Sequence, residues 1–328
     1  MAWTAMPATL RRLVEERLGA PVTRHQRAYG GYGPSVSLRL QAENGARVFV
    51  KGAGPESNEV NWRTIPYEQA LYESGALAGI APAYRGSVTH TGWHLLLLED
   101  LGQGGRVPPW TPERARAVMS DIARFHATVK PPPVVLPLPP DVGGNWTRVA
   151  SDPVTRSAFM ALFAPGTGAA AWLDGTLPAL RAAEDDFWSA GRLSPEVAGR
   201  SVFLHADIRS DNLRVRDGRL ILFDWAAAAI GPAIFDPVFF LPSLVAESAL
   251  DPEPLLAHYR AALQSHGIAI DERAIDAAAA LTAGYFAAAA GLPVPPLLPR
   301  LRMVQKAQLG PALRFATGRL GLPFPELL

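Results

Sequence analysis

The dipeptide Asp217-Gly218, placed between two short alternating segments, constrains this chain more than any other local feature. It is a strong signal for a two-residue β-hairpin turn, whose central positions favour residues that tolerate positive φ. Folding the ribbon about this turn sets position 216 against 219, 212 against 223 and 211 against 224. We therefore expect Asn212 and Asp224 to meet at the open end of one hairpin, with Asp207 just upstream of it.

The side chains at that open end have the chemistry of a cation site. Asn212 and Asp224 both offer oxygen atoms, which hard divalent cations prefer, and a free carboxylate at Asp207 can accept a proton. Phosphoryl transfer needs both functions, because a metal neutralises phosphate charge while a carboxylate orients the attacking hydroxyl. Asp and Asn are also common at strand ends and as turn caps, so the ribbon alone leaves a structural role open.

The composition is that of an ordinary enzyme. A chain of 328 residues, 48% hydrophobic and 19% charged, is long enough for a full core and two lobes. Its 31 basic residues nearly cancel its 30 acidic ones, so bulk charge recruits neither nucleic acid nor anionic lipid. The absence of cysteine excludes disulfides, thiolate zinc sites and a cysteine nucleophile. It fits a reducing compartment, and we expect the cytoplasm.

The N-terminal part, to Leu101, has the pattern of a small antiparallel sheet with helices. Charged residues at 11–17 interrupt any apolar stretch of signal-peptide length, and apolar spacing over 10–18 predicts a helix, capped by Thr9 and ended by Gly19. Alternation over 36–40 and 48–51, about an Asn-Gly turn, predicts a hairpin. A helix is expected over 67–74 and a buried strand over 93–98.

After Leu101 the composition shifts to Gly and Pro, and helical periodicity dominates the remainder. We place a lobe boundary there, giving lobes 1–101 and 102–328. Helices are predicted over 115–128, 177–190, with Thr176 as its cap, and 253–267. The apolar run 277–294 is mostly alanine and is interpreted as a buried helix rather than a membrane span.

A longer pattern supplies the specificity that the hairpin lacks. His205-x-Asp207, then Asn212, and then Asp224-Trp225 resemble the catalytic and metal loops of the aminoglycoside phosphotransferase and choline kinase superfamily, relatives of the protein kinases. The resemblance implies an α+β, bilobal, protein-kinase-like fold and a kinase that uses ATP and Mg²⁺ to phosphorylate a hydroxyl. It implies Asp207 as the catalytic carboxylate and Asn212 and Asp224 as metal ligands.

The same resemblance assigns nucleotide-binding positions in the N-terminal lobe. Gly30, Gly31 and Gly33 look like the loop that covers the phosphates, and Lys51 looks like the strand lysine that pairs with them. Glu68 stands where the superfamily keeps the glutamate that salt-bridges this lysine; Glu59 and Glu73 are its rivals. Glu99, after the strand over 93–98, resembles the start of the hinge whose backbone binds adenine.

Two more residues are implied as supports of the catalytic loop. Asp236, in the pattern Gly231-Pro232-x-x-x-Asp236-Pro237, would accept backbone hydrogen bonds from the loop, and His205 would brace it from within. Ala206 departs from the commoner glycine at its position. His126, on a predicted helix, is assigned a structural role.

Three alternatives and the acceptor stay open. The chain can be a kinase-like nucleotide-binding module without catalysis, or a non-haem iron oxygenase using His205, Asp207 and a distant histidine such as His258; a binuclear metallohydrolase is the poorest fit. The expected partner is a small-molecule alcohol substrate, and no nucleic-acid or membrane partner is expected. The protein itself is expected to be a monomer or a homodimer. A cationic acceptor would need carboxylates, and an apolar alcohol or sugar derivative would need an apolar pocket. The candidate carboxylates are Asp185, Asp186, Glu247 and Asp251, and the candidate apolar residues are Tyr285, Phe286, Leu292 and Met303.

Overall fold

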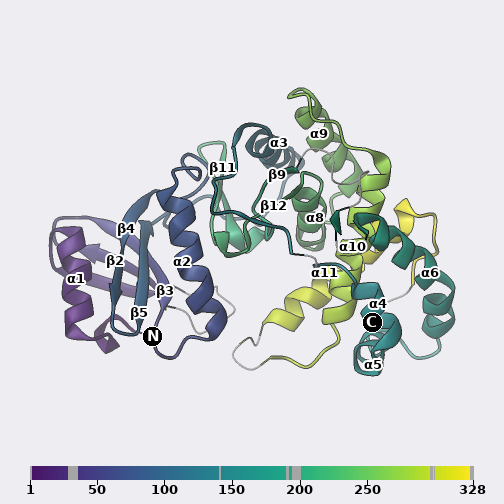
Figure 1. The fold of residues 1–328 in the computed structure, drawn as a ribbon, viewed down its shortest axis with the longest axis horizontal. Coiled ribbons are helices and arrows are strands. Elements are labelled where there is room, and N and C mark those ends of the chain that lie inside the picture. The colour runs from purple at the N-terminus through teal and green to yellow at the C-terminus, as the bar shows by residue number, and fades with distance from the viewer. Residues whose placement is uncertain are drawn as a thin grey trace.

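The computed structural model describes residues 2–28, 36–139, 142–189, 192–193, 201–295, 298 and 300–325. The chain forms an N-terminal part built on an antiparallel sheet and a larger, mainly helical C-terminal part (Figure 1). The predicted α+β, bilobal fold is confirmed.

Within the described residues, the N-terminal sheet has five antiparallel strands in the order β1-β2-β3-β5-β4. Their bounds are β1 Val22–Arg27, β2 Val36–Ala42, β3 Arg47–Ala53, β4 Tyr84–His90 and β5 Trp93–Glu99. The predicted turn joins β2 to β3, and β3 lies between β2 and β5. Lys51, near the end of β3, consequently pairs with Ser37 on one side and Leu96 on the other.

Both faces of this sheet are covered, which explains the continuous apolar run of β5. Leu95 and Leu97 point into a core shared with α1 (Ala8–Leu18), whereas Leu96 and Leu98 point into the core shared with α2 (Glu59–Glu73). Alternate residues of a strand face opposite sides, so a strand covered on both sides must be apolar at every position.

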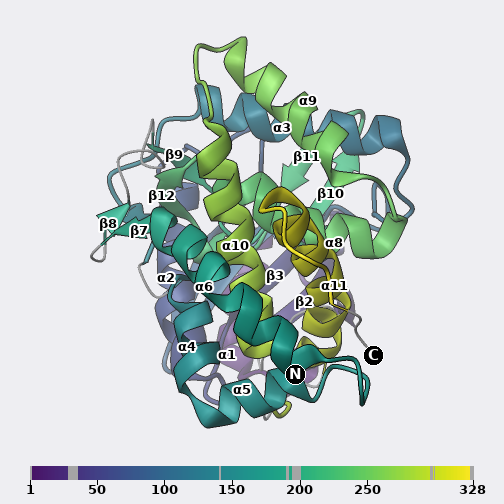
Figure 2. The same ribbon diagram turned by 90° about the vertical axis from the view of Figure 1, so that its right-hand side faces the viewer.

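The C-terminal part is a helical assembly around a small set of strands. Figure 2 shows α10 running through it, with α6 and α11 alongside. The helices are α3 Pro112–Thr128, α4 Asn145–Ser151, α5 Pro153–Met160, α6 Ala169–Phe187, α8 Phe235–Ser248, α9 Pro252–Gln264, α10 Glu272–Ala289 and α11 Leu301–Arg319. The strands are β6 Leu136–Pro137, β7 Trp188–Ser189, β8 Arg192–Leu193, β9 Ser201–Leu204, β10 Leu213–Arg216, β11 Arg219–Leu222 and β12 Ala229–Pro232.

The predicted hairpin is formed by β10 and β11. Its register pairs Arg216 with Arg219 and continues outward to Leu213 and Leu222, and the turn residues Asp217 and Gly218 both have positive φ. The next pair is joined by one hydrogen bond, from the amide of Phe223 to the carbonyl of Asn212 at 3.0 Å. The predicted pairing of 211 with 224 is wrong, because 210–212 wind into a 3-10 turn and Asp224 adopts a φ of 68°.

Two predicted helix caps are also wrong. Thr9 lies inside the first turn of α1, whose N-cap is Pro7, although Gly19 ends the helix in the left-handed conformation as expected. Thr176 lies inside α6, which begins at Ala169, and its hydroxyl donates to the carbonyl of Trp172 instead. A threonine hydroxyl bonds to the preceding helical turn as readily as it caps, so local sequence does not separate the two roles.

The alanine-rich run forms a buried helix, as predicted. Residues 277–284 of α10 are all buried, packed between α6, α4 and α11. No helix among the described residues is both long enough and apolar enough to cross a membrane.

A buried carboxylate joins two helices of the C-terminal part. Glu184 on α6 is 1% exposed and accepts the amides of Asn145 and Trp146, the first turn of α4, at 3.0 Å each. These amides have no partner within their own helix, because the first turn lacks preceding carbonyls. Burial raises the pKa of Glu184 to about 7, despite the two hydrogen bonds.

Replacing Glu184 with Ala is expected to lower the free energy of unfolding by about 2–4 kcal/mol, since two buried amides lose their acceptor. Urea unfolding followed by circular dichroism measures this change. Asp185→Ala, at the exposed neighbouring position, is the control and should change stability by less than about 0.5 kcal/mol. Equal losses in the two variants would contradict the role given to Glu184.

Candidate active site

The loop between β9 and β10, residues 205–212, is hydrogen-bonded through two of its backbone amides to one buried carboxylate. Asp236, fully buried in the first turn of α8, accepts the amide of His205 with Oδ2 and the amide of Ala206 with Oδ1, both at 2.8 Å. His126 on α3 contacts Oδ2 of Asp236 at 3.0 Å, and its other ring nitrogen meets the hydroxyl of Tyr259. The brace is therefore itself fixed by two further helices.

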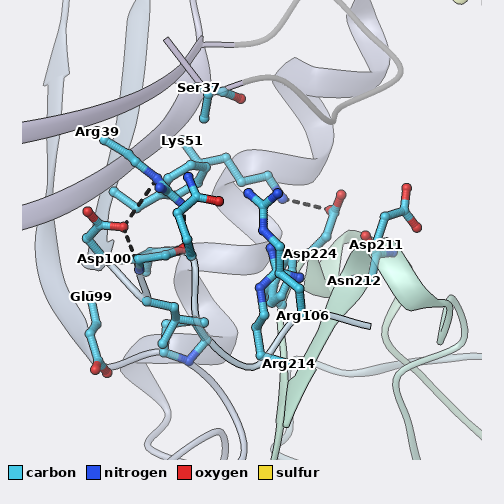
Figure 3. Close-up of a pocket in the computed structure, with 18 of the residues that line it drawn as sticks. Ser37, Arg39, Lys51, Glu99, Asp100, Arg106, Asp211, Asn212, Arg214 and Asp224 are labelled. Atoms are coloured by element: carbon cyan, nitrogen blue, oxygen red, sulfur yellow. Dashed lines mark hydrogen bonds and ion pairs between the residues drawn. The ribbon is translucent and has the colours of Figure 1, made fainter. Parts of the chain in front are cut away.

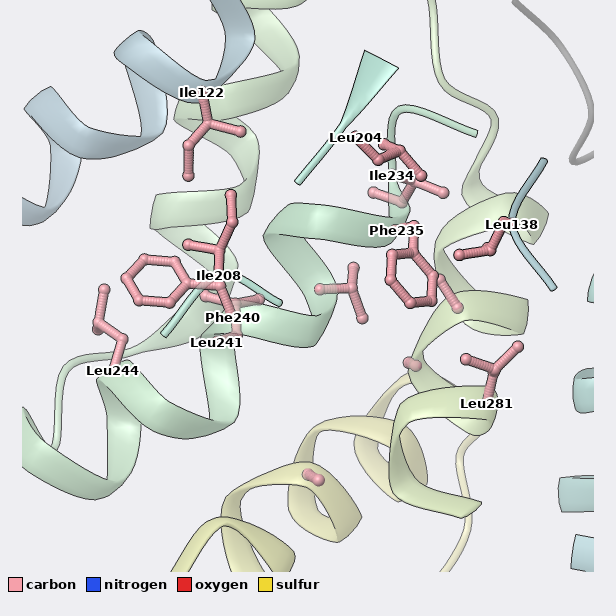
Figure 4. Packing of buried hydrophobic residues seen from close by; sticks show 14 of the residues in the cluster. Ile122, Leu138, Leu204, Ile208, Ile234, Phe235, Phe240, Leu241, Leu244 and Leu281 are labelled. Carbon is pink, nitrogen blue, oxygen red and sulfur yellow. The ribbon is translucent and has the colours of Figure 1, made fainter. Parts of the chain in front are cut away.

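Apolar packing anchors the same loop. Ile208 is 1% exposed and packs among Phe240, Leu241 and Leu244 of α8 (Figure 4). Because Ile208 directly follows Asp207, the loop is pinned on both sides of the candidate catalytic carboxylate.

Ala206 occupies a backbone position that suits glycine. Its φ is 60°, in the left-handed region, which costs an L-residue roughly 1–2 kcal/mol. The hydrogen bond from its amide to Asp236 acts against this strain. A glycine would adopt this φ without the steric cost of a side chain.

Asp207 faces Asn212 and Arg209. The amide nitrogen of Asn212 donates to Oδ2 of Asp207 at 2.8 Å, and Nε of Arg209 lies 3.5 Å from the same oxygen. Burial raises the pKa of Asp207 to about 7, although Arg209 and Asn212 act in the opposite direction. Its carboxylate is thus both oriented and more basic than an exposed one.

His205 lies within the loop, and both its ring nitrogens contact backbone groups. Its Nδ1 accepts the amide of Asp207 at 3.3 Å, and its Nε2 lies 3.2 Å from the carbonyl of Phe223, where it donates. Burial lowers the pKa of His205, so the neutral ring is favoured. Both ring nitrogens are engaged within the site's own backbone.

Lys51 lies between two carboxylates from different parts of the molecule. Its Nζ is 2.5 Å from Oε2 of Glu68 on α2. It is also 2.7 Å from Oδ1 of Asp224, a contact that Figure 3 shows. Burial would lower the pKa of Lys51, but Asp224 and Glu68 together raise it above its usual value. Burial would raise the pKa of Asp224, yet Lys51 holds it below its ordinary value. The predicted Lys51–Glu68 ion pair is present; the rivals Glu59 and Glu73 are exposed.

A cavity of about 400 Å³ opens beside this ion pair. Figure 3 shows that its walls come from the sheet, from the segment after β5, and from the hairpin of the C-terminal part. Glu99 lines it, with its side chain engaged by the amide of Ala83 and by Arg216, and residues 98–103 form one edge of the cavity.

The cavity floor carries the two candidate metal ligands. Asn212 and Asp224 both line it, and the amide nitrogen of Asn212 is turned toward Asp207. The side-chain oxygen of Asn212, Oδ1, is therefore free of that contact. Asp224 contributes a carboxylate whose side chain is 38% exposed. Oxygen donors of this kind fit Mg²⁺.

Sequence reasoning found Lys51 but missed the arginines of this site. Arg209 bridges Asp207 and Asp211, at 3.5 and 3.1 Å. Its signal was its place two residues after Asp207. Arg39 pairs with Asp100 at 3.3 Å, and Arg106 and Arg214 also line the cavity. The guanidinium of Arg214 lies over the ring of Phe223, which no sequence spacing foretells.

Two expectations have different outcomes. The glycine loop with Gly30, Gly31 and Gly33 lies outside the described residues. For the iron-oxygenase alternative, the described chain contains no group of three or more His, Asp or Glu side chains that could hold a metal, and His258 contacts Ser120 instead.

Comparisons with known proteins identify a matching family and solved structures with a similar fold. The model of the phosphotransferase enzyme family matches residues 26–281, more than half of the chain. Spectinomycin phosphotransferase, in complex with ADP and spectinomycin, has a TM-score of 0.64 at 13% identity, over 98% of this chain and 99% of that one. No curated protein sequence matches significantly.

Two further solved structures have similar folds. Amicoumacin kinase in complex with AMP-PNP and Ca²⁺ has a TM-score of 0.55 at 11% identity, over 94% of this chain and 93% of that one. Choline kinase from Streptococcus pneumoniae has a TM-score of 0.52 at 13% identity, over 96% and 97%. At these identities the likeness concerns the fold alone.

Replacing Lys51 with Met is expected to destabilise the protein by about 3–5 kcal/mol, because the fully buried Glu68 is left without its cation. In Lys51→Met/Glu68→Gln the loss should be smaller than the sum of the single losses. Chemical denaturation of the four proteins in a double-mutant cycle measures the coupling. Glu73→Gln, on the same helix but exposed, is the control with a change below about 1 kcal/mol; strict additivity would show that the pair is not coupled.

Proposed function

The chain belongs to the phosphotransferase enzyme family, and from this we propose that it is a small-molecule kinase that transfers the γ-phosphoryl group of ATP to a hydroxyl. The observation that carries the proposal is the position of Asp207. Its carboxylate is fixed by Asn212 and Arg209 in the same loop that supplies the floor of the cavity beside Lys51.

Each group of the site has a proposed task in this reaction. ATP occupies the cavity, its base along the backbone of 98–103 and its phosphates near Lys51. Mg²⁺ would be held by Asn212 and Asp224, and when bound it neutralises charge on the phosphates. Asp207 orients the acceptor hydroxyl and takes its proton as the new O–P bond forms and the bond from the γ-phosphorus to ADP breaks.

Arg209 supports the same step through its charge. Its guanidinium lies against Asp207 and Asp211, and it lowers the pKa of Asp207 and of Asp224. We assign it a positioning role: its charge favours the ionised form of Asp207, and its contacts hold the two carboxylates of the loop in place.

The alternative is a nucleotide-binding module without catalysis. It would explain the ion pair of Lys51 and the cavity, but it gives no role to a partly buried carboxylate held beside an amide and a guanidinium. We favour the enzyme for that reason.

We further propose that its two domains are the lobes 1–101 and 102–328. We propose that it acts as a monomer or homodimer without a nucleic-acid partner. Its proposed location is the cytoplasm, which the absence of cysteine fits.

Replacing Asp207 with Asn is expected to reduce turnover by about 10²–10⁴-fold, the range for loss of a general base, while leaving nucleotide affinity within about threefold. Product formation is followed by coupled assay, and magnesium-dependent nucleotide binding by calorimetry. Asp217→Asn, at the exposed hairpin turn, is the matched control. Near-normal turnover in Asp207→Asn, or the lack of any phosphoryl transfer by the wild-type chain, would count against the proposal.

The pH dependence of kcat/KM for the acceptor is expected to have an acidic limb, because protonated Asp207 cannot accept the hydroxyl proton. Since Arg209 lowers the pKa of Asp207, Arg209→Gln should move this limb to higher pH. Arg209→Lys, which keeps the charge, should leave it close to the wild-type position. A limb that stays in place or moves to lower pH in Arg209→Gln would show that the two groups are not coupled.

A further inference from the structure

Two arginines that line the cavity beside Lys51 have no acidic partner. Arg106 and Arg214 both line it, and neither forms an ion pair with a described residue. The described acids that line the same cavity each contact a cation: Glu68 and Asp224 contact Lys51, Asp100 contacts Arg39, Glu99 contacts Arg216, and Asp211 contacts Arg209. The cavity therefore has uncompensated positive charge at these two arginines.

The side chain of Arg214, on β10, is held at the cavity by its own hairpin. Its Nη1 donates to the carbonyl of Leu213 at 2.7 Å, and its guanidinium carbon lies 5.1 Å from the centre of the Phe223 ring. Its Nε is buried and has no hydrogen-bond partner among the described residues. The guanidinium thus has donors that no group of the described chain satisfies, and buried polar groups normally have a partner. An acceptor for these donors has to come from a ligand or from water.

A backbone contact places Arg106 close to Arg214. The amide of Val215 donates to the carbonyl of Gly105 at 2.8 Å, which joins the two segments that carry these arginines. Gly105 has a φ of 71°, and a Cβ there would lie 2.5 Å from the carbonyl oxygen of Val215, so this approach requires glycine. Burial lowers the pKa of Arg214 to about 10, and the charges of Arg106 and Arg39 act in the same direction. An anion bound beside these guanidiniums would offset their mutual repulsion.

The two arginines lie between the ends of the cavity. In Figure 3, the labelled side chains of Arg106 and Arg214 lie between Asp100, next to the edge formed by residues 98–103, and Asp224. In the function proposed above, the base of ATP lies along 98–103 and the transferred phosphate lies near the metal ligands. In ATP the α-phosphate follows the ribose and precedes the β- and γ-phosphates. The α-phosphate is consequently the anionic group that falls beside Arg106 and Arg214.

We propose that Arg106 and Arg214 bind the α-phosphate of the nucleotide, and that this contact does not require the metal. The proposal rests on the kinase function above and deepens it by naming the residues that hold one part of its substrate. A guanidinium suits this task, because its planar fork of N–H donors matches the oxygens of a phosphate. Lys51 is already engaged by Glu68 and Asp224, whereas the two arginines have no counter-ion in the described chain.

The test compares adenosine with AMP, two ligands that differ only by the α-phosphate. Calorimetric titration of the full chain in the presence of EDTA measures both affinities without a divalent cation. We expect the wild type to bind AMP at least about tenfold more tightly than adenosine, a difference of about 1.4 kcal/mol. Arg106→Gln and Arg214→Gln should each lower this ratio by about threefold or more, the scale of a solvent-screened ion pair. The double variant should bind the two ligands with equal affinity.

Arg219→Gln is the matched control. Arg219 lies on β11 of the same hairpin, is exposed, and lies outside the set of residues that line the cavity. The variant removes the same charge from the hairpin and should leave the ratio of the two affinities unchanged. Arg214→Lys, which keeps the charge but not the fork of donors, should retain part of the preference for AMP. The affinity for adenosine should be the same in all the proteins, which shows that the cavity is intact in each.

The outcomes separate this inference from the function on which it rests. If AMP binds without metal no better than adenosine, or if the double variant keeps the wild-type ratio, the inference is overturned. It is also overturned if Arg214→Gln weakens adenosine and AMP equally, because Arg214 would then contact the base. In each case, phosphoryl transfer that depends on Asp207 leaves the proposed function standing. If the wild type transfers no phosphoryl group but loses its preference for AMP in the double variant, the α-phosphate contact stands and the proposed function fails.

Discussion

The ion pair of Lys51 with Glu68 and Asp224 is the interaction on which the site depends. It joins strand β3 and helix α2 of the N-terminal part to the residue that follows β11 in the C-terminal part. Glu68 is fully buried and Lys51 nearly so, so each charge requires the others to remain ionised. Together with the contacts of Arg216 with Glu99 and of Leu222 with Ile80, this ion pair joins the sheet to the hairpin on either side of the cavity.

The catalytic loop has a second, independent support. Asp236 holds two consecutive amides, and Ile208 is locked into the core of α8. Positive φ at Ala206 and at Asp224 shows that the chain is strained at both ends of the segment that carries Asp207 and Asn212. Such strain persists where the surrounding contacts fix the conformation. Here those contacts are the hydrogen bonds of Asp236 to the loop and the ion pair of Lys51 with Asp224.

The local sequence was sufficient to predict those features of the structure that depend on residues close together in the chain. The Asp217-Gly218 turn sets the register of β10 and β11, and this register brings Asn212 to the cavity, as expected. Choosing Glu68 over its rivals needed the family resemblance, although the stripe of Ile65, Glu68 and Leu71 places this acid among apolar residues of α2.

Tertiary contacts decided what the sequence left open. Asp224 adopts a positive φ, and its carboxylate contacts Lys51, a partner far away in the sequence that local spacing does not identify. Arg209 was overlooked because its partners, Asp207 and Asp211, are its neighbours in the chain and spacing does not reveal which way the side chains point. The caps of α1 and α6 were misplaced because a threonine hydroxyl can either accept a backbone amide at a helix start or donate to a carbonyl of the preceding turn inside a helix, as Thr176 does.

The brace from Asp236 has a consequence for how this architecture diversifies. The loop that carries Asp207 is fastened to α8 and α3, whereas α10 and α11 pack against each other and against α4, α6 and α8. Substitutions on the outer faces of α10 and α11 are therefore expected to leave the position of this loop unchanged. For the kinase proposed above, such a division of the scaffold would let the C-terminal helices diverge while the loop that carries Asp207 keeps its geometry.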